Sequence, residues 1–248
     1  MKFEDAYCEF EHCVMPIHKV SFMYNIDAAN FSNNYKNSFW CPECRIAQLS
    51  YHNAATPYFS TYPNSSHAGN CSLQQDEMSA SDIKAFVGNN KNREKIMRQM
   101  DSLMHLLLSE TETTKSNVQS FNPFPKQAIP VTHIKVTATR RFPRKRIDAP
   151  FRNEDFNCYK FFYGDVILTW EKNNACGGYK IILRSLETKK FLCRINITDR
   201  VYSYIHDDFK LSKPFACKIV FLACMQKTKK NYLKTSLRES NYLNIHKI

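Results

Sequence analysis

The hydrophobic pattern changes its period along the chain. From Arg93 onward, apolar side chains recur three or four positions apart, at Ile96, Met97, Met100, Leu103, Met104 and Leu107. This spacing places one apolar stripe along a helix of about four turns. A shorter stretch with the same spacing, 83–87, follows Ser81, which we expect to cap it. The sequence therefore predicts two helices between residues 81 and 108.

Beyond residue 131 the pattern is typical of strands. The predicted strands are 131–137, 159–170, 179–186, 191–197, 215–225, 232–237 and 242–245. Residues 199–210 are expected to form a short helix or a loop. Many short strands joined by basic turns are typical of a small closed or half-closed barrel. We predict an α+β protein whose C-terminal domain is a mostly-β, OB-like barrel, with a β-sandwich as the alternative.

A segment without periodicity separates the two patterns. Residues 109–130 are polar and end in the Pro-rich stretch 121–125. The charge changes sign here: residues 1–125 hold 10 Lys/Arg and 13 Asp/Glu, a net −3, whereas residues 126–248 hold 25 and 10, a net +15. We expect a first domain at 1–108, a protease-sensitive linker at 109–130 and an independently folding second domain at 131–248.

Four residues of the first domain have the spacing of a metal site. Cys41 and Cys44 form one close pair, His67 and Cys71 form another, and 22 residues lie between the pairs. Zinc takes four N or S ligands in a tetrahedron, and two close pairs joined by a hairpin supply them. The intervening residues suit two strands followed by a turn at 63–66. With four protein ligands and no open position for water, the predicted zinc is structural.

The same segment resembles a known module. The residues Phe39-Trp40-Cys41-Pro42-Glu43-Cys44, Tyr58-Phe59-Ser60, His67 and Cys71 are similar to the N-terminal zinc-ribbon-like module of the competence protein CoiA family. In the leader, 5–7, 16–18 and 27–29 occupy places where that module has a short hairpin. The resemblance covers residues 1–75 and implies a zinc module common in bacterial nucleic-acid and defence proteins. Nuclease activity is not implied, because the family's later acidic and lysine motif is missing from this sequence.

The leader and the other cysteines bear on metal sites and on compartment. Residues 7–13 and 17–24 suit short strands. Cys8 and Cys13, with His12 and His18, are a possible second metal site, although a core role fits their loose spacing better. Most of the remaining cysteines lie in apolar runs, where a thiol behaves as a small hydrophobe. With no apolar signal segment and no apolar run of about 18 residues, we expect a cytoplasmic protein and no membrane partner.

The sequence offers little support for an enzyme. With only 5 Gly, it contains no GxGxxG or GxxxxGK phosphate loop, and GxSxG and HExxH motifs are also missing. His206-Asp207-Asp208 is a possible Mg²⁺ site of a nuclease, because carboxylates are ligands that Mg²⁺ prefers. Adjacent acidic residues more often cap a helix or lie in a loop. We therefore predict no catalytic residues.

The basic second half indicates a phosphate-bearing partner. Five cations within seven residues, broken by Pro143, predict an exposed basic loop, and a second basic turn lies near residue 229. The predicted nucleic-acid-binding residues are Arg140, Arg141, Arg144, Lys145, Arg146, Lys229 and Lys230. Further cations lie among the aromatic residues of the strands, as in surfaces that bind single strands. We expect a zinc-containing protein that binds nucleic acid, with single strands preferred.

Two other interpretations remain open. The basic half would also suit an adaptor subunit that docks an acidic protein surface, and the helix near 93–108 would suit a homodimer. The zinc module favours an accessory role in bacterial or phage defence or in mobile-element biology. The predicted nucleic acid is DNA or RNA.

Overall fold

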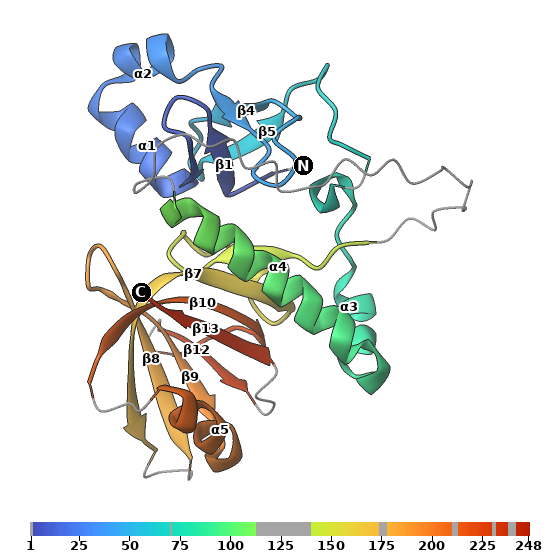
Figure 1. Ribbon diagram of the computed structural model, residues 1–248, viewed down its shortest axis with the longest axis vertical. Helices are drawn as coiled ribbons and strands as arrows, with labels where there is room; N and C mark the ends of the chain where they lie inside the picture. The colour runs from blue at the N-terminus through green and yellow to red at the C-terminus, as the bar shows by residue number, and fades with distance from the viewer. Residues whose placement is uncertain are drawn as a thin grey trace.

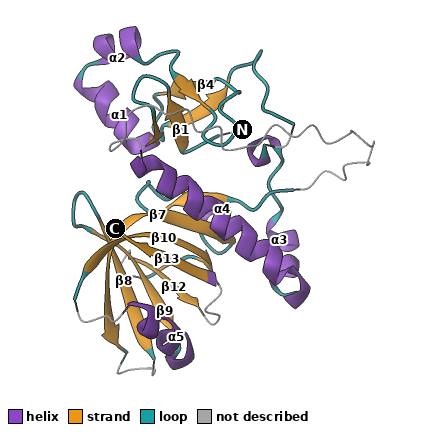
Figure 2. Cartoon of the chain, viewed as in Figure 1, coloured by secondary structure: helices purple, strands orange, loops and turns teal. Residues whose placement is uncertain are grey.

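The computed structural model describes residues 2–69, 71–112, 140–173, 178–209, 213–229, 232–237 and 242–248; of 109–112, 204 and 207–209 it gives the backbone alone. The chain is α+β, as predicted: a small N-terminal unit, a long helix and a large curved sheet (Figures 1 and 2). The predicted strand 131–137 lies outside these ranges. The predicted linker, 109–130, also lies outside them, except for residues 109–112, whose backbone is helical.

The N-terminal unit is built from two small antiparallel sheets. Strands β1 (Asp5–Cys8), β2 (Cys13–Pro16) and β3 (Phe39–Trp40) form one sheet in the order β2-β1-β3. Strands β4 (Leu49–His52) and β5 (Tyr58–Thr61) form the hairpin expected between the two ligand pairs. An isolated bridge from Phe3 to Phe59 joins the two sheets. The aromatic core of this unit therefore lies directly behind the ligand-bearing loops.

Residues 17–24 form a helix, and the predicted strand there is wrong. Helix α1 (Ile17–Ile26) buries Ile17 and Val20, which lie three positions apart and so share one helix face. Helix α2 (Ala28–Asn34) follows at once. The carboxylate of Asp27 accepts a hydrogen bond from the Asn30 backbone N–H at 2.9 Å and caps α2. Aromatic residues in this stretch had obscured the helical spacing.

The two predicted helices are α3 (Ala80–Val87) and α4 (Arg93–Glu112), with single 3₁₀ turns before each at Ser72–Gln74 and Asn90–Asn92. The cap of α3 is Ser79, not Ser81: the Ser79 hydroxyl accepts a hydrogen bond from the Asp82 backbone N–H at 3.2 Å. The predicted stripe of α4 is buried, except that Met97 is exposed. Both helices therefore exist where the apolar spacing predicted them.

One large sheet contains most of the remaining strands. They are β6 (Arg144–Arg146), β7 (Tyr159–Lys172), β8 (Tyr179–Ser185), β9 (Phe191–Ile197), β10 (Phe215–Cys224), β11 (Gln226–Lys227), β12 (Leu233–Leu237) and β13 (Leu243–Lys247). The order is β11-β12-β9-β8-β7-β10-β13, with β6 alongside β7. Most neighbours are antiparallel, but β12 is parallel to β9 and β6 is parallel to β7. The order is an open path, so no closed barrel is found among the described strands.

The two faces of this sheet pack against different helices. The inner face buries Ile181, Leu183, Cys193 and Ile195, and Val201 and Ile205 of α5 (Asp199–Phe209) join that core. The outer face of β7 and β10 packs against α4. Figure 1 shows α4 lying between the sheet and the N-terminal unit. Because a helix of the predicted first domain packs on the sheet of the second, the hydrophobic cores do not divide at the predicted linker.

Candidate metal centre

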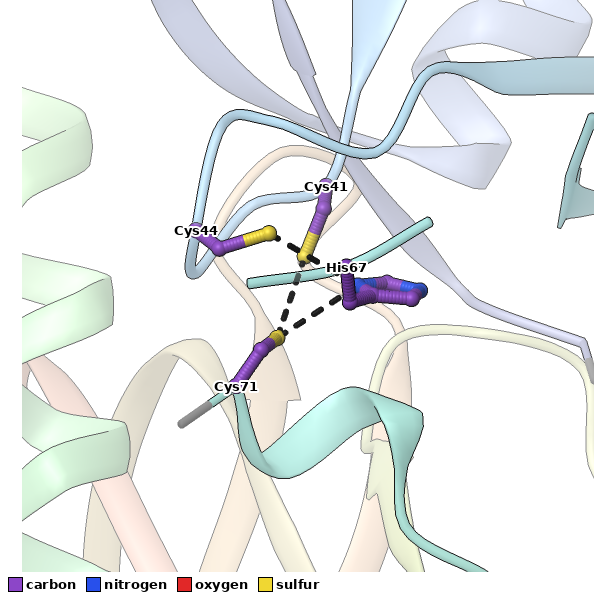
Figure 3. A group of neighbouring side chains, drawn as sticks. All are labelled: Cys41, Cys44, His67 and Cys71. Carbon is purple, nitrogen blue, oxygen red and sulfur yellow. Dashed lines mark hydrogen bonds between the residues drawn. The ribbon is translucent and has the colours of Figure 1, made fainter. Parts of the chain in front are cut away.

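The four predicted metal ligands meet at one point of the N-terminal unit. Cys41 and Cys44 lie in the turn after β3, and His67 and Cys71 lie in the loop after β5 (Figure 3). The turn is tight: the Arg45 backbone N–H donates to the Cys41 carbonyl at 3.0 Å, and Arg45 takes a left-handed φ of 53°. The Cys41 N–H donates to the Ala47 carbonyl at 2.7 Å. These backbone bonds aim both thiols at the second pair.

Three of the six distances between the ligand atoms match the edges of a tetrahedral site. The Cys41 and Cys71 sulfurs are 3.7 Å apart, and His67 Nδ1 lies 3.7 Å from Cys44 Sγ and 3.4 Å from Cys71 Sγ. All four atoms lie within 4.8 Å of one another. Zinc bonds of about 2.3 Å to sulfur and about 2.0 Å to nitrogen require edges of about 3.5 to 3.8 Å in a tetrahedron. The side chains present therefore fit a metal of this kind.

Local hydrogen bonds favour thiolates at two of these positions. Cys71 has its pKa lowered to about 7 by the hydrogen bond from Cys41, although burial acts in the opposite direction. Burial is also the largest influence on Cys44, but the backbone N–H groups of Ala47, Ala68 and Ile46 outweigh it and lower the pKa of that thiol. A metal ligand has to be a thiolate, so these surroundings suit metal binding.

His67 presents Nδ1 to the sulfurs, and its other ring nitrogen has a partner of its own. Nε2 lies 3.3 Å from the Thr61 hydroxyl on β5, and the ring packs edge-on against Phe3 with centroids 5.8 Å apart. A second hydrogen bond of this kind fixes the orientation and tautomer of a ligating histidine. Thr61 had no signal in the sequence, since nothing distinguished it from other strand residues.

Glu43, between the two cysteines of the first pair, ties the ligand loops to the large sheet. Its carboxylate accepts from the Ser72 hydroxyl at 2.8 Å and from the Ser72 backbone N–H at 3.2 Å, and it forms an ion pair with Arg144 on β6. Arg144 also donates to the Ser72 hydroxyl at 2.8 Å. Burial opposes ionisation of Glu43, but Arg144 outweighs it and holds the pKa of the carboxyl below its usual value. Glu43 therefore remains a carboxylate that joins both ligand loops to β6.

The basic segment 140–146, here called the cation strip, is mostly interior. The expectation that its five cations are exposed is wrong for three of them: Arg141 is 6% exposed, and Lys145 and Arg146 are each 2% exposed. Of the other two, Arg144 is half-buried and Arg140 has a side chain that is 59% exposed. The charges can be buried because each meets a carboxylate.

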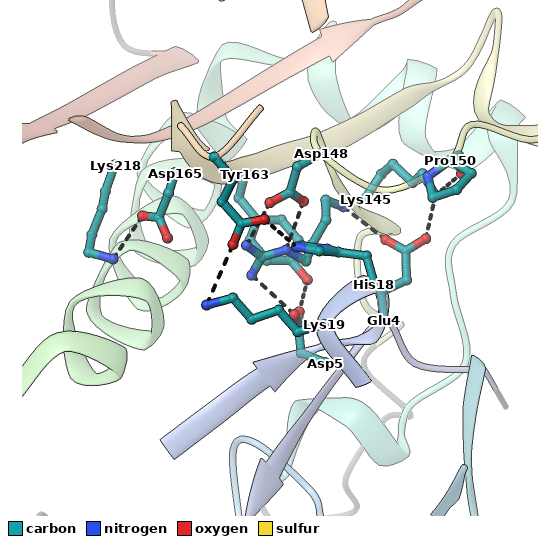
Figure 4. A network of polar contacts seen from close by, with 12 residues as sticks. Glu4, Asp5, His18, Lys19, Lys145, Asp148, Pro150, Tyr163, Asp165 and Lys218 are labelled. Carbon is teal, nitrogen blue, oxygen red and sulfur yellow. Dashed lines mark hydrogen bonds and ion pairs between the residues drawn. The ribbon is translucent and has the colours of Figure 1, made fainter. Parts of the chain in front are cut away.

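Those carboxylates come largely from the acidic N-terminal half. Lys145 pairs with Glu4 (Figure 4). Arg146 pairs with Asp5 at 3.1 Å and, through two nitrogens, with Asp148 at 2.9 and 3.0 Å. Two further pairs are Arg141 with Glu77 at 2.7 Å and Arg140 with Asp82 at 2.9 Å. The Tyr163 hydroxyl donates to Asp5 and completes the network. The cation strip is thus the ionic contact between β6 and the first half of the chain.

The remaining predicted site residues belong neither to the metal centre nor to the cation strip. Lys229 is exposed in the turn before β12, and Lys230 lies outside the described residues. His206 belongs to α5, whose Asp207 and Asp208 side chains are likewise not described. Cys8 and Cys13 face each other across the β1–β2 ladder. Apart from the four predicted ligands, the described residues contain no group of three His, Cys, Asp or Glu side chains placed to hold a metal.

Comparison of the chain with protein-family models, with curated proteins and with solved structures finds no match. None of the described helices combines the length and the apolar character needed to cross a membrane. The assignment of a function therefore depends on the geometry of this chain.

Proposed function

We propose that the chain is a zinc-containing nucleic-acid-binding protein. In this proposal zinc is structural and holds the N-terminal unit together, while the large sheet provides the surface that contacts phosphates. The Cys₃His set supports the first part, because its ligand spacing, the lowered pKa values of Cys44 and Cys71 and the fixed histidine all suit zinc. The resemblance of residues 1–75 to the CoiA-type module implies the same metal.

The observation that carries the second part is the surplus of cations on the sheet half. After the cation strip has been neutralised, twelve Lys and Arg side chains of this half still have no carboxylate within 4 Å in the described part of the chain. They are Lys172, Lys180, Arg184, Lys189, Lys190, Arg194, Arg200, Lys213, Lys227, Lys229, Lys234 and Lys247. A dense field of unpaired cations attracts phosphate.

The connectivity of the strands supports an OB-like sheet within this proposal. Strand β7 lies between β8 and β10, α5 joins β9 to β10, and β12 runs parallel to β9. Only Met225 separates β10 from β11, which pairs with β12, and the Thr235 hydroxyl donates to the Cys224 carbonyl at 2.9 Å. Within the eight-stranded sheet, the five strands β7, β8, β9, β12 and β10 with β11, together with α5, would suit the partly open barrel of folds that bind oligonucleotides.

Binding of fluorescently labelled oligonucleotides to the whole protein tests the proposal. We expect affinity for DNA or RNA that falls steeply as salt is raised, because each phosphate contact releases counterions. Single- and double-stranded DNA and RNA of one length form the panel. No binding to any of the four at low salt would overturn the nucleic-acid part. Salt-insensitive capture of an acidic protein instead would favour the adaptor interpretation.

A further inference from the structure

The outer face of strands β8, β9 and β12 carries four cations at alternating positions. Inner-face neighbours such as Ile181 and Cys193 are fully buried. Residues opposite each other in a ladder share a face, so the pairings place these side chains together on the outer face. The cations, here called the cationic sheet face, are Lys180, Arg184, Arg194 and Lys234.

No described helix covers this part of the sheet. Helix α4 packs on the outer face of β7 and β10, where Phe161 and Val220 meet Met100 and Leu103. Helix α5 lies on the opposite, inner face. Arg184 is exposed, and the other three cations are half-exposed. Two acidic residues of β7 lie on this face: Glu171, opposite Lys180, makes no ion pair within the described residues, and Asp165 is paired with Lys218 at 2.8 Å. The cationic sheet face therefore has no carboxylate partner within the described chain.

Aromatic side chains border the same face. A bulge between Leu183 and Arg184 places Phe191 opposite Arg184, so both lie on the outer side, and Phe191 is 39% exposed. The rings of Phe191 and Tyr232 are perpendicular, with centroids 6.1 Å apart. The Arg194 guanidinium lies 5.2 Å from the Tyr232 ring centre and donates to its hydroxyl at 3.3 Å. Arg194 is thus held in place by an aromatic ring and has no carboxylate partner.

This combination selects one class of partner. Cations without acidic partners suit a chain of phosphates, and an exposed aromatic ring suits the face of a base. A duplex hides its base faces within the stack, and an acidic peptide offers no regular series of rings.

We propose that the cationic sheet face binds single-stranded nucleic acid, with phosphates on Arg184, Arg194 and Lys234 and a base stacked on Phe191. The inference rests on the proposed function and names its surface and its substrate class. The cation strip plays no part in it.

Two sets of substitutions in the whole protein test the surface. The first replaces Arg184, Arg194 and Lys234 together by Gln, and its matched control replaces Lys84, Lys91 and Lys95 by Gln. These control residues are exposed cations on and between α3 and α4. We expect the first set to lower affinity for a labelled single strand at least tenfold and to flatten the salt slope by about 2, at about 0.7 per phosphate contact. The control set is expected to change affinity less than twofold.

Phe191→Leu tests the stacked base. It should weaken single-strand binding about fivefold or more, the lower end of what one stacked base contributes, and leave the salt slope unchanged. Circular dichroism and metal content establish that each variant is folded. Arg184→Gln alone, at an exposed position without partners, is the variant least able to disturb folding. It should flatten the salt slope by about a third of the change seen in the triple variant.

The outcomes separate this inference from the proposed function. If the unaltered protein binds no nucleic acid, both are overturned. If it binds with a steep salt dependence but the first set and the control behave alike, the surface is wrong and the proposed function stands. Tighter binding of duplex than of single strands, or an unchanged affinity in Phe191→Leu, would contradict the single-strand assignment.

Discussion

The cation strip gathers five Lys and Arg side chains within seven consecutive residues, whereas the cationic sheet face collects four from strands spread over positions 180 to 234. In the strip, Lys145 and Arg146 are almost wholly buried against carboxylates. On the sheet face, Arg184 and its neighbours have no such partners among the described residues. Density of charge along the sequence therefore does not indicate which cations are free to meet a ligand.

The acidic first half explains the difference. Its net −3 and the +15 of the second half suggested an external, phosphate-bearing partner for the cations. Glu4, Asp5, Glu43 and Glu77 instead bring part of that opposite charge to the cation strip. A charge asymmetry between two halves of a chain can thus be an internal interface first, and only the surplus remains for a ligand.

The largest expected loss of structure comes from removing the metal, which would separate the cation strip from Glu43, one of its acidic partners. We expect about one zinc per purified chain and none in Cys44→Ser. Because a structural zinc supplies folding free energy directly, the variant should lose the structure of residues 1–75 and with it the Glu43–Arg144 contact. Metal analysis and near-ultraviolet circular dichroism measure this. Cys158→Ser, outside the cluster, should keep the metal, and full zinc occupancy in Cys44→Ser would contradict the assignment.

Arg146→Met tests the buried role of the strip. It leaves Asp5 and Asp148 without their cation, and loss of one partner of a buried ion pair costs about 3–5 kcal/mol. Urea unfolding should show this loss, whereas Arg184→Met on the sheet face should stay within about 0.5 kcal/mol. The folded fraction of Arg146→Met should bind oligonucleotides as the parent does. If the two variants were equally stable, the cation strip would not differ from the cationic sheet face in its contribution to the stability of the fold.

A smaller loss of stability is expected when the pH is lowered and Asp155 becomes protonated. Burial opposes its ionisation, but the Arg152 backbone N–H and the ammonium groups of Lys160 and Lys145 outweigh burial and lower its pKa below 3.8. A carboxyl with a lowered folded-state pKa stabilises the fold above its unfolded pKa, near 4, and loses that contribution as the pH falls further. Asp155→Asn should therefore flatten the loss of stability measured by urea below pH 4. The exposed Glu154→Gln should leave that curve as it is, and a steeper curve in Asp155→Asn would show that the sign is wrong.

The smallest effect should come from Arg140, the most exposed member of the strip. Its ion pair with Asp82 lies at the surface, so Arg140→Ala should leave the urea midpoint almost unchanged. On oligonucleotide binding it should remove one phosphate contact at most, a change of about 0.7 in the salt slope. A loss of affinity as large as that of the triple sheet-face variant would indicate that the cation strip, and not the cationic sheet face, binds the nucleic acid.

Features fixed by local spacing were the ones that the sequence predicted. The close pairs Cys41–Cys44 and His67–Cys71, the stripe of α4 and the strand patterns of β7 to β10 all depend on neighbours within a few positions. The helix at Ile17–Ile26 was not predicted, because only two of its residues, Ile17 and Val20, are buried. A stripe of two residues is too short to define a period.

Features fixed by distant partners could not be predicted. Nothing near Arg146 in sequence indicates Asp5, and nothing near Glu43 indicates Arg144. The rule that a dense run of cations stays in water fails when carboxylates from another part of the chain meet it. The cationic sheet face shows the reverse, because its members become neighbours only through the pairing of β8, β9 and β12.

The ion pairs of the first strand also set an order of events during synthesis. Glu4 and Asp5 leave the ribosome well before their partners, because Lys145 lies 141 positions after Glu4, and Tyr163 lies 158 positions after Asp5. A chain grows from its N-terminus, and contacts between such distant positions close slowly. The metal-bearing hairpin can form as soon as its own residues have emerged. Docking of the first strand against β6 and β7 must come later, so the nascent chain keeps two carboxylates in water until β6 and β7 have been made.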